Sequence, residues 1–391
     1  RFTAASTVQP TTLPAHASLL TGIYPATHGV REHIGSLLPD RFVTLPMVLK
    51  AAGYTTGAIF TYIGLRREYS NLQRGFDTYE DTTQGIPAAL QDTSAGEVSR
   101  LLHRVIDYSP AAKLAEGLLK STSSLEEQLW DSADVTTEQA LAWLSAVDRQ
   151  RFFLWVHYFD PHYPWTPPSP FDTMFERDYT GAATGGWPTI RSIQNDATLP
   201  ARDVDHLRAL YAGEVAYADA GVGRLLARLR SDGVAGNTIV VVLADHGQSL
   251  GEAGRWFHDS DMSPQLTDIP LIVRLPGGPV QLVVDSPVET IDVMPTLLDA
   301  VGLGVEAGAL DGKSLLPLIM GGAADRDQNR VTVSERNDGL RFVVRNRQWR
   351  MVAEPDRKRY QLFDPAADPS SSSDVARLHP DALEELKAWL S

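Results

Sequence analysis

Short apolar runs alternate along the chain with stretches whose apolar residues recur at helical spacing. Residues 55–63, 152–156 and 237–244 are such runs, and each predicts a strand. The first is expected to be buried and the second to be a central parallel strand, while the third is the clearest strand of the chain. Residues 205–231 carry one long apolar stripe that includes Val215, which predicts an amphipathic helix. This alternation favours an α/β fold with a mostly parallel central sheet and helices on both faces.

Shorter elements complete the prediction for the first part of the chain. Helices are expected over residues 44–53, 136–147 and 293–301, the second of them starting with a capping box at Thr136. Residues 165–200 are rich in Pro, Gly, Thr and Asp and predict a long loop. Loops of this length are often functional, so this one is expected to shape specificity.

The pattern of apolar and polar residues changes near residue 329. Four short segments then alternate like antiparallel strands, and residues 381–390 predict a closing helix; the segments are residues 331–334, 340–345, 348–353 and 360–363. We therefore expect a main domain over residues 1–328 and a small C-terminal α+β subdomain, an antiparallel sheet plus a helix, over residues 329–391.

Composition narrows the possible functions. The net charge of −14 over 391 residues argues against a general nucleic-acid binder. The chain has no cysteine, which excludes disulfides, thiolate metal sites and a cysteine nucleophile. No apolar run is long enough to span a membrane. The first residue is Arg1 rather than Met, so the sequence does not indicate the compartment. It does not indicate the oligomeric state either.

Polar side chains follow two of the predicted strands. Asp245 and His246 come directly after residues 237–244, and His157 and His162 follow residues 152–156. Sites in open parallel sheets gather at the carboxyl ends of strands. Asp and His are ligands for zinc or manganese, and the carboxylate also suits calcium. The alternative is that these residues are ordinary turn and buried residues.

His258 lies in a glycine- and aromatic-flanked loop shortly after this pair of residues. It could contact an anionic substrate. The alternative for a lone loop histidine is simple surface exposure.

A threonine-rich segment near the start is the candidate nucleophile region. Thr11 and Thr12 precede Pro14, which proteins tolerate in the first turn of a helix, and an apolar run follows. A helix N-terminus offers N–H groups and partial positive charge to an anion. The alternative is an ordinary capped helix, because Ser and Thr are common N-caps.

Together these motifs resemble the sulfatase branch of the alkaline phosphatase superfamily. That branch carries a Cys/Ser-x-Pro-x-Arg nucleophile motif shortly before Thr-Gly, and here Thr12-x-Pro14-x-His16 leads into Leu19-Leu20-Thr21-Gly22. Further matches lie in order along essentially the whole chain: residues 44–54, 153–164, 245–252, 270–273, 295–298, 310–315 and 362–369.

The resemblance implies a fold and a set of roles. The fold is alkaline-phosphatase-like, with residues 1–328 as the catalytic domain. A divalent metal (zinc, manganese or calcium) is expected on Asp245, His246 and Thr12. Thr12, His16 and His162 are the expected catalytic residues, and His258 and His157 are expected to bind substrate.

Two departures from the family pattern qualify this expectation. Thr12 stands where sulfatases carry the Cys or Ser that becomes formylglycine, and His16 replaces the accompanying arginine. No formylglycine is therefore expected, because oxidation of a secondary alcohol gives a ketone. The Thr-x-Pro-x-His pattern is similar to threonine-nucleophile phosphodiesterases and pyrophosphatases of the superfamily. The family's first strand, which ends in metal-binding Asp residues, is missing from this sequence, and we expect it upstream.

The predicted function is a metal-dependent, sulfatase-like hydrolase of small sulfate or phosphate/phosphonate esters, acting through a covalent Thr12 intermediate. The alternative is a catalytically impaired protein of the same fold, with an anion-binding or structural role.

Overall fold

The computed structural model describes residues 1–83, 132–147, 151–195, 197–258, 261–304, 308–321 and 330–390. The chain divides into two compact units. Unit 1 comprises Arg1–Leu45, Gly236–Ser249 and His258–Ser391, and unit 2 comprises Pro46–Ala235 and Leu250–Phe257. Each unit is described separately below.

Unit 1 gathers its core from distant parts of the chain. Strand β1 pairs with β9 in parallel, and β5 pairs with β8 in antiparallel register. Apolar side chains from the first residues, from β8 and from α13 and α14 pack into one cluster around Leu271, Val288 and Leu315. The elements are β1 (Ala5–Ser6), α1 (Thr12–Thr21), α2 (Pro25–His28), β5 (Val240–Leu243), α12 (Pro264–Thr267), β8 (Leu271–Arg274), β9 (Val288–Glu289), α13 (Val293–Ala300) and α14 (Leu316–Met320).

Helix α1 is wholly buried. Its ten buried residues include the polar side chains of Thr12, His16, Ser18 and Thr21. Ser18 on this helix lies 2.8 Å from Nε2 of His28, whose Nδ1 accepts the N–H of Val30. The Nε2–H of His28 therefore donates to Ser18. Burial lowers the pKa of His28 to about 3, so this contact joins neutral groups.

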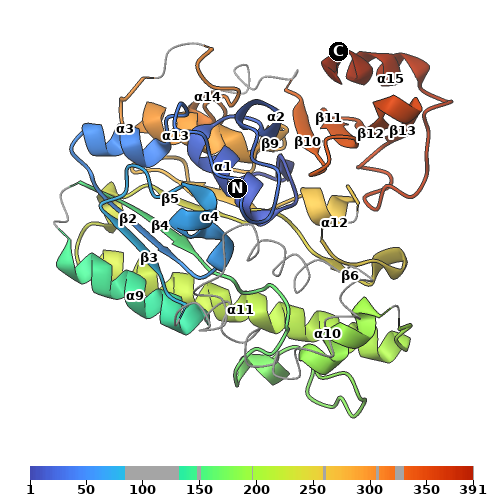
Figure 1. Ribbon diagram of the computed structural model, residues 1–391, viewed down its shortest axis with the longest axis horizontal. Helices are drawn as coiled ribbons and strands as arrows, with labels where there is room; N and C mark the ends of the chain where they lie inside the picture. The colour runs from blue at the N-terminus through green and yellow to red at the C-terminus, as the bar shows by residue number, and fades with distance from the viewer. Residues whose placement is uncertain are drawn as a thin grey trace. The chain divides into compact units, whose positions relative to one another are not determined.

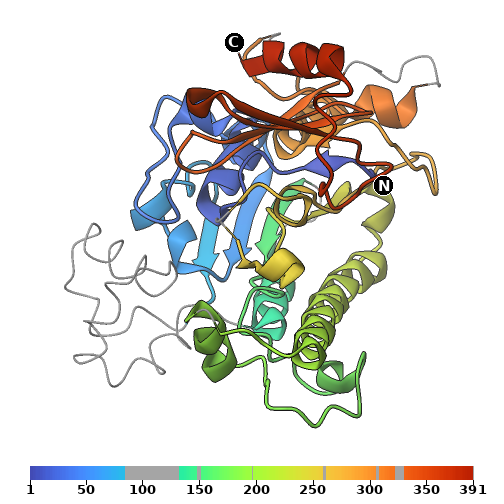
Figure 2. The same cartoon turned by 90° about the vertical axis from the view of Figure 1, so that its right-hand side faces the viewer.

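The C-terminal part of unit 1 is a four-stranded antiparallel sheet with one helix packed on it (Figure 2). Leu386 of the helix is fully buried among the side chains of the strands. The strands are β10 (Thr332–Glu335), β11 (Phe342–Arg345), β12 (Arg350–Glu354) and β13 (Arg359–Phe363), and the helix is α15 (Pro380–Lys387). These elements confirm the antiparallel strands and the helix expected here, while the boundary at residue 329 stays a prediction.

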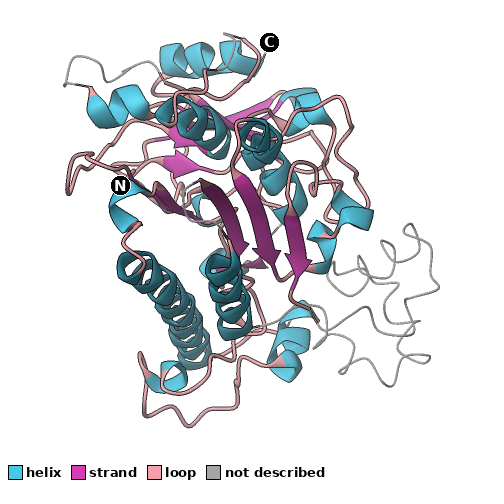
Figure 3. Cartoon of the chain, turned by 90° about the vertical axis from the view of Figure 1, so that its left-hand side faces the viewer, coloured by secondary structure: helices cyan, strands magenta, loops and turns pink. Residues whose placement is uncertain are grey.

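Unit 2 is built on three parallel strands in the order β3-β2-β4 (Figure 3). Helix α9 packs on them: its Trp143 covers Gly57 of β2, where a Cβ atom would lie only 2.4 Å from the indole. The long helix α11 runs beside α9 (Figure 1). The elements are α3 (Leu45–Ala51), β2 (Thr55–Phe60), α4 (Arg67–Ser70), β3 (Thr78–Asp81), α9 (Ala133–Ala146), β4 (Phe152–His157), α10 (Trp187–Gln194) and α11 (Ala201–Ser231). The short strands β6 (Ser249–Leu250) and β7 (Trp256–Phe257) pair with each other.

The buried face of α11 differs from the predicted stripe. Val215 belongs to that stripe and yet is 45% exposed, while Glu214 beside it is 2% exposed. Gly213 and Gly221 are also buried, and both lie against other chain segments, so they let the helix approach its neighbours closely. Leu207, Leu210 and Leu229 of the predicted stripe are buried, so the stripe is wrong at Val215 and hydrophobicity alone misses the buried glycines and Glu214.

Several predicted boundaries are wrong. Helix α9 begins at Ala133 rather than at the expected capping box, and Thr136 is buried inside it. Residues 165–200 contain helix α10 and a 3₁₀ turn at Phe171–Thr173, so this region is not one long loop. The α/β class itself is confirmed by the parallel sheet and its flanking helices. Among the described residues, no helix combines the length and apolarity needed to cross a membrane.

Candidate active site

Thr12 is the first residue of helix α1. The preceding residue, Thr11, is extended and forms the N-cap, and its carbonyl accepts the N–H of Ala15 at 3.0 Å. Pro14 lies in the first turn, where a missing N–H costs no helical hydrogen bond. The Thr12 side chain is therefore held at the positive end of the helix dipole, and the residue is 8% exposed.

Asp245 and His246 follow strand β5 and reach the same place. Nε2 of His246 lies 3.3 Å from Oγ1 of Thr12 and 3.6 Å from Oδ2 of Asp245. Gly247 allows this turn, since a Cβ atom there would lie 1.9 Å from the carbonyl oxygen of Gln265. The threonine of one segment and the Asp-His pair of another thus meet within unit 1.

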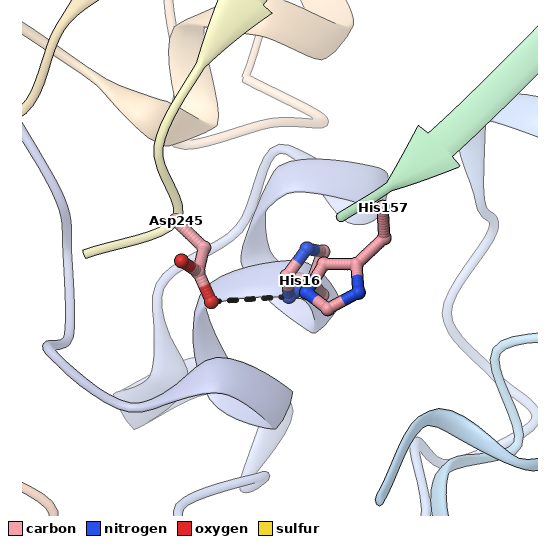
Figure 4. Close-up of side chains that lie close together, drawn as sticks. All are labelled: His16, His157 and Asp245. Atoms are coloured by element: carbon pink, nitrogen blue, oxygen red, sulfur yellow. Dashed lines mark ion pairs between the residues drawn. The ribbon is translucent and has the colours of Figure 1, made fainter. Parts of the chain in front are cut away.

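His16 completes this group from the next turn of α1. Its Nδ1 lies 2.8 Å from the carbonyl oxygen of Thr12 and 3.7 Å from Oδ2 of Asp245. Figure 4 marks the contact between His16 and Asp245 with a dashed line. The carboxylate of Asp245 therefore has imidazole nitrogens of two histidines within 4 Å, and the side chain of His16 is 4% exposed.

The hydrogen bonds assign the tautomers of both histidines. Nδ1–H of His16 donates to the carbonyl of Thr12 and Nδ1–H of His246 donates to the carbonyl of Gly247, at 2.8 Å in each case. Nε2 is then the lone-pair nitrogen of each neutral ring. Histidines that bind metals commonly donate their other ring N–H to a carbonyl in this way. One carboxylate and oriented imidazoles form a donor set that fits a divalent metal.

A row of imidazoles continues from His246. The ring centroid of His258 lies 4.6 Å from that of His246 and 5.6 Å from that of His33. His258 is 9% exposed and His33 is 3% exposed, so His258 is not the exposed loop residue of the alternative interpretation. The sequence prediction includes His258 and misses His33. His33 lies in the stretch Arg31-Glu32-His33-Ile34, which has no periodic pattern to indicate burial.

His157 and His162 belong to unit 2. His157 is the last residue of β4. His162 lies between the rings of Phe159 and Tyr163, with centroid distances of 4.2 and 4.1 Å. Its Nδ1 lies 2.7 Å from the carbonyl of Tyr163, which assigns the same tautomer as in His16 and His246. The roles of these two unit 2 histidines stay predictions.

The other predicted site residues meet within unit 1. The contacts described above join Thr12, His16, Asp245, His246 and His258. They come from the start of helix α1, from the segment after β5 and from the loop that follows it. The carboxyl end of strand β5 and the N-terminus of α1 therefore supply one group of polar side chains, whose roles stay predictions.

Comparisons with known proteins agree with this fold. A model of the sulfatase family matches residues 1–303. The multifunctional alkaline phosphatase superfamily protein PehA of Trinickia caryophylli is 26% identical over 428 residues, spanning 93% of this chain and 80% of that protein. Arylsulfatase K of Bos taurus is 28% identical over 200 residues, spanning 47% of this chain and only 36% of that protein.

Among solved structures, the phosphonate monoester hydrolase SpPMH from Silicibacter pomeroyi is similar, with a TM-score of 0.73. The two chains are 22% identical, and the superposition covers 100% of this chain and 87% of the other. At that identity the likeness shows the fold. Because the family model matches well over half of the chain, this protein belongs to the sulfatase family and is an ester-bond hydrolase with an α/β fold.

Proposed function

We propose that this protein is a metal-dependent hydrolase of small anionic esters that uses Thr12 as its nucleophile. The observation that carries the proposal is the 3.3 Å contact between Oγ1 of Thr12 and Nε2 of His246, beside the carboxylate of Asp245. A hydroxyl at a helix N-terminus, next to a potential metal-binding pair, has the surroundings that an activated alcohol nucleophile needs.

The metal is a proposal based on the chemistry of these donors. The sulfatase family is in general metal-dependent. Asp245 and His246 would hold zinc, manganese or calcium, with Thr12 as a further oxygen donor. A bound divalent ion would supply Lewis-acid stabilisation of the charge that develops on the transferred group and would lower the pKa of the threonine hydroxyl.

The residues of the chain would then act in two steps. The Thr12 oxygen loses its proton to solvent and attacks phosphorus or sulfur in line, and the bond to the alcohol oxygen breaks. The N–H groups of Thr12 and Leu13, together with the helix dipole, stabilise charge on the transferred group. His258 donates a proton to the leaving oxygen. Water then attacks the Thr12 ester and its proton passes to His258, while the departing Thr12 oxygen takes up a proton from solvent and the inorganic or phosphonic acid is released.

His16 and the unit 2 histidines have narrower proposed roles. Nδ1–H of His16 donates to the carbonyl of Thr12 and lies 3.7 Å from the carboxylate of Asp245, so we propose that His16 orients the segment of Thr12 beside Asp245. For His162 we propose proton donation or anion binding, and for His157 substrate binding, as expected from the sequence.

The substrate class follows from the nucleophile. A threonine cannot become formylglycine, which argues for phosphate or phosphonate esters over sulfate esters. A relative of the same fold is named a phosphonate monoester hydrolase, and another relative is named an arylsulfatase. We therefore propose phosphate and phosphonate esters as the preferred substrates, with sulfate esters as slower ones.

A panel of chromogenic sulfate, phosphate mono- and diester and phosphonate substrates, assayed with added zinc, manganese or calcium, tests the proposal. Thr12→Ala should lower turnover on the order of 10⁴-fold or more, because the nucleophile is removed. Thr12→Ser keeps a hydroxyl and should retain measurable activity. Thr21→Val is the matched control, since Thr21 is a buried threonine at the far end of the same helix.

Full activity of Thr12→Ala would contradict the assignment. In that case Thr11→Ala identifies whether the neighbouring hydroxyl is the nucleophile. A wild-type protein that hydrolyses no ester in the panel would contradict the proposed activity and would favour the alternative of an anion-binding protein.

A further inference from the structure

The segment that leads into Thr12 is held by the C-terminal sheet. Thr7, Val8 and Gln9 are fully buried. The backbone N–H of Glu335, at the end of β10, donates to the carbonyl of Val8 at 2.8 Å. Oγ of Ser334 donates to the carbonyl of Thr7 at 2.5 Å. Buried carbonyls need such partners, so β10 fixes the path of the chain just before the helix.

The carboxylate of Glu335 extends this connection to a second segment. It pairs with the guanidinium of Arg31 at 3.2 Å, and its side chain is only 6% exposed. The carbonyl of Arg31 in turn accepts the side-chain amide of Gln9 at 3.0 Å. Glu335, Arg31 and Gln9 therefore form a closed circuit of contacts, because the backbone N–H of Glu335 donates to Val8, the residue before Gln9.

The turn between β10 and β11 fixes the side chain of Arg31. Gly339 has a φ of +67°, and a Cβ atom there would lie 2.4 Å from Nη1 of Arg31. The guanidinium therefore lies directly on the backbone of this turn. Arg31 is two residues before His33, whose ring continues the imidazole row from His246 and His258.

We propose that Glu335 is a positioning residue, which acts through Arg31 and the backbone of Val8 to hold the segments that carry Thr12 and His33 in reacting geometry. The inference rests on the proposed function of Thr12. The carboxylate of Glu335 bonds to Arg31 and its backbone N–H bonds to Val8, so its effect on Thr12 and His33 is to fix where they lie. A displacement of about 1 Å at a reacting centre costs roughly 10²-fold in rate, so this circuit matters for turnover.

The variant Glu335→Gln tests the proposal while keeping the shape of the side chain. It removes the charge that holds Arg31 and leaves the backbone bond to Val8. We expect kcat on a phosphonate ester to fall about 10- to 100-fold. KM should stay within about twofold, since the direct contacts to substrate are unchanged. Ser334→Ala, which removes the bond to Thr7, should act in the same direction.

Leu386→Ala is the matched control for lost stability. Leu386 is fully buried under the same C-terminal sheet and takes no part in the circuit. Its truncation should lower thermal stability clearly, because it leaves a cavity in the core of that sheet. If Glu335→Gln lowers kcat far more than Leu386→Ala does, at a smaller loss of thermal stability, the positioning role is supported. Equal kcat in Glu335→Gln and the wild type would overturn it.

Amide hydrogen exchange separates this proposal from the proposed function. Residues 7–12 and 31–33 should exchange faster in Glu335→Gln than in Leu386→Ala, whatever the substrate. Unchanged exchange in these residues would overturn the positioning role even in an active enzyme. A wild-type protein without esterase activity but with the expected exchange would contradict the proposed function alone.

Discussion

The carboxylate of Asp245 is the group on which the proposed metal site depends most. It is the one acid among the side chains that meet around Thr12 in the described part of unit 1, with His16 and His246 each within 4 Å of its Oδ2. A hard anionic oxygen gives a divalent cation most of its electrostatic attraction in such a site. Loss of its charge should therefore weaken metal binding directly.

Asp245→Asn should weaken the binding of zinc or manganese by at least about tenfold. Isothermal titration of the chelator-stripped protein measures this without any substrate. Asp285→Asn, which removes an exposed acid paired with Arg347 in the same unit, is the control and should leave the affinity unchanged. Equal affinities in the Asp245→Asn variant and the wild type would remove Asp245 from the metal site.

His258 should matter most for substrates with poor leaving groups. An alkoxide needs a proton as it departs, whereas a nitrophenolate is stable without one. His258→Ala should therefore lower kcat/KM about 10²- to 10⁴-fold for alkyl esters and less than about tenfold for nitrophenyl esters. Steady-state kinetics on both classes measure the difference. The same loss for both classes would argue against proton donation by His258.

At this scale the sequence predicts the candidate site residues, whose roles stay predictions, and misses residues that contact them or the segments that carry them. Asp245, His246 and His258 follow a recognisable strand, and Thr12 and His16 lie in a motif, so their types and order indicate chemistry. His33 and Glu335 carry no such signal. Their importance comes from contacts with residues far along the chain, such as Arg31 with Glu335, which no local pattern encodes.

At the scale of elements, two acids of unit 2 interact: one is half-buried and follows strand β4, and the other is buried on helix α11. Asp160 comes three residues after the end of the strand, and Glu214 projects from the helix. Burial raises the pKa of Glu214 to about 9, with the charge of Asp160 as a further cause. Burial also raises the pKa of Asp160. The two carboxyls therefore share a proton at neutral pH rather than ionise together.

This pair predicts how stability depends on pH. The folded protein keeps a proton on Glu214 up to about pH 9, while the unfolded chain loses it near the ordinary value of 4.5. The folded state binds more protons than the unfolded chain between these pH values. The contribution of Glu214 to the free energy of unfolding therefore falls as pH rises from about 4.5 to about 9. Glu214→Gln, which keeps a donor for Asp160, should flatten this fall.

Urea unfolding at several pH values between about 5 and about 9 measures the effect. The stability of Glu214→Gln relative to the wild type should rise steadily with pH. Glu138→Gln removes an exposed acid on α9 and should run parallel to the wild type. A parallel curve for Glu214→Gln as well would mean that Glu214 does not hold the proton.

The elements themselves are easier to predict than their buried faces. Apolar runs indicate β2, β4 and β5, because a short continuous run of apolar residues is by itself a signal of a strand. The stripe on α11 is wrong at Val215, since packing there uses Gly213, Gly221 and Glu214 instead. Glycines and a protonated acid can also form a buried helix face, but their burial becomes visible only once the segments packed against the helix are known.

At the scale of the whole molecule, two strongly apolar strands are only half-buried. Within the described residues, β4 pairs only with β2 and β5 only with β8. All residues of β4 and β5 are half-buried although their sequences are almost wholly apolar, whereas β2 is buried over five of its six residues. Apolar strands of this kind are typical of the interior of a sheet.

The division into units is not predictable from local patterns. Unit 1 combines three separate stretches of the chain, and the site residues Thr12 and His246 come from two of them. Periodicity predicts elements within a window of about 11–18 residues, so it cannot indicate which distant windows pack together. The family motifs supply that long-range order.

The most direct test of Thr12 as the nucleophile is to trap the covalent intermediate. The protein with added metal is mixed with a slowly hydrolysed phosphonate ester, quenched in acid, digested and mapped by mass spectrometry. A phosphonyl group is expected on the peptide that contains Thr12, and none in the Thr12→Ala variant. A burst of alcohol release with the adduct on another residue, or with no adduct at all, would contradict Thr12 as the nucleophile.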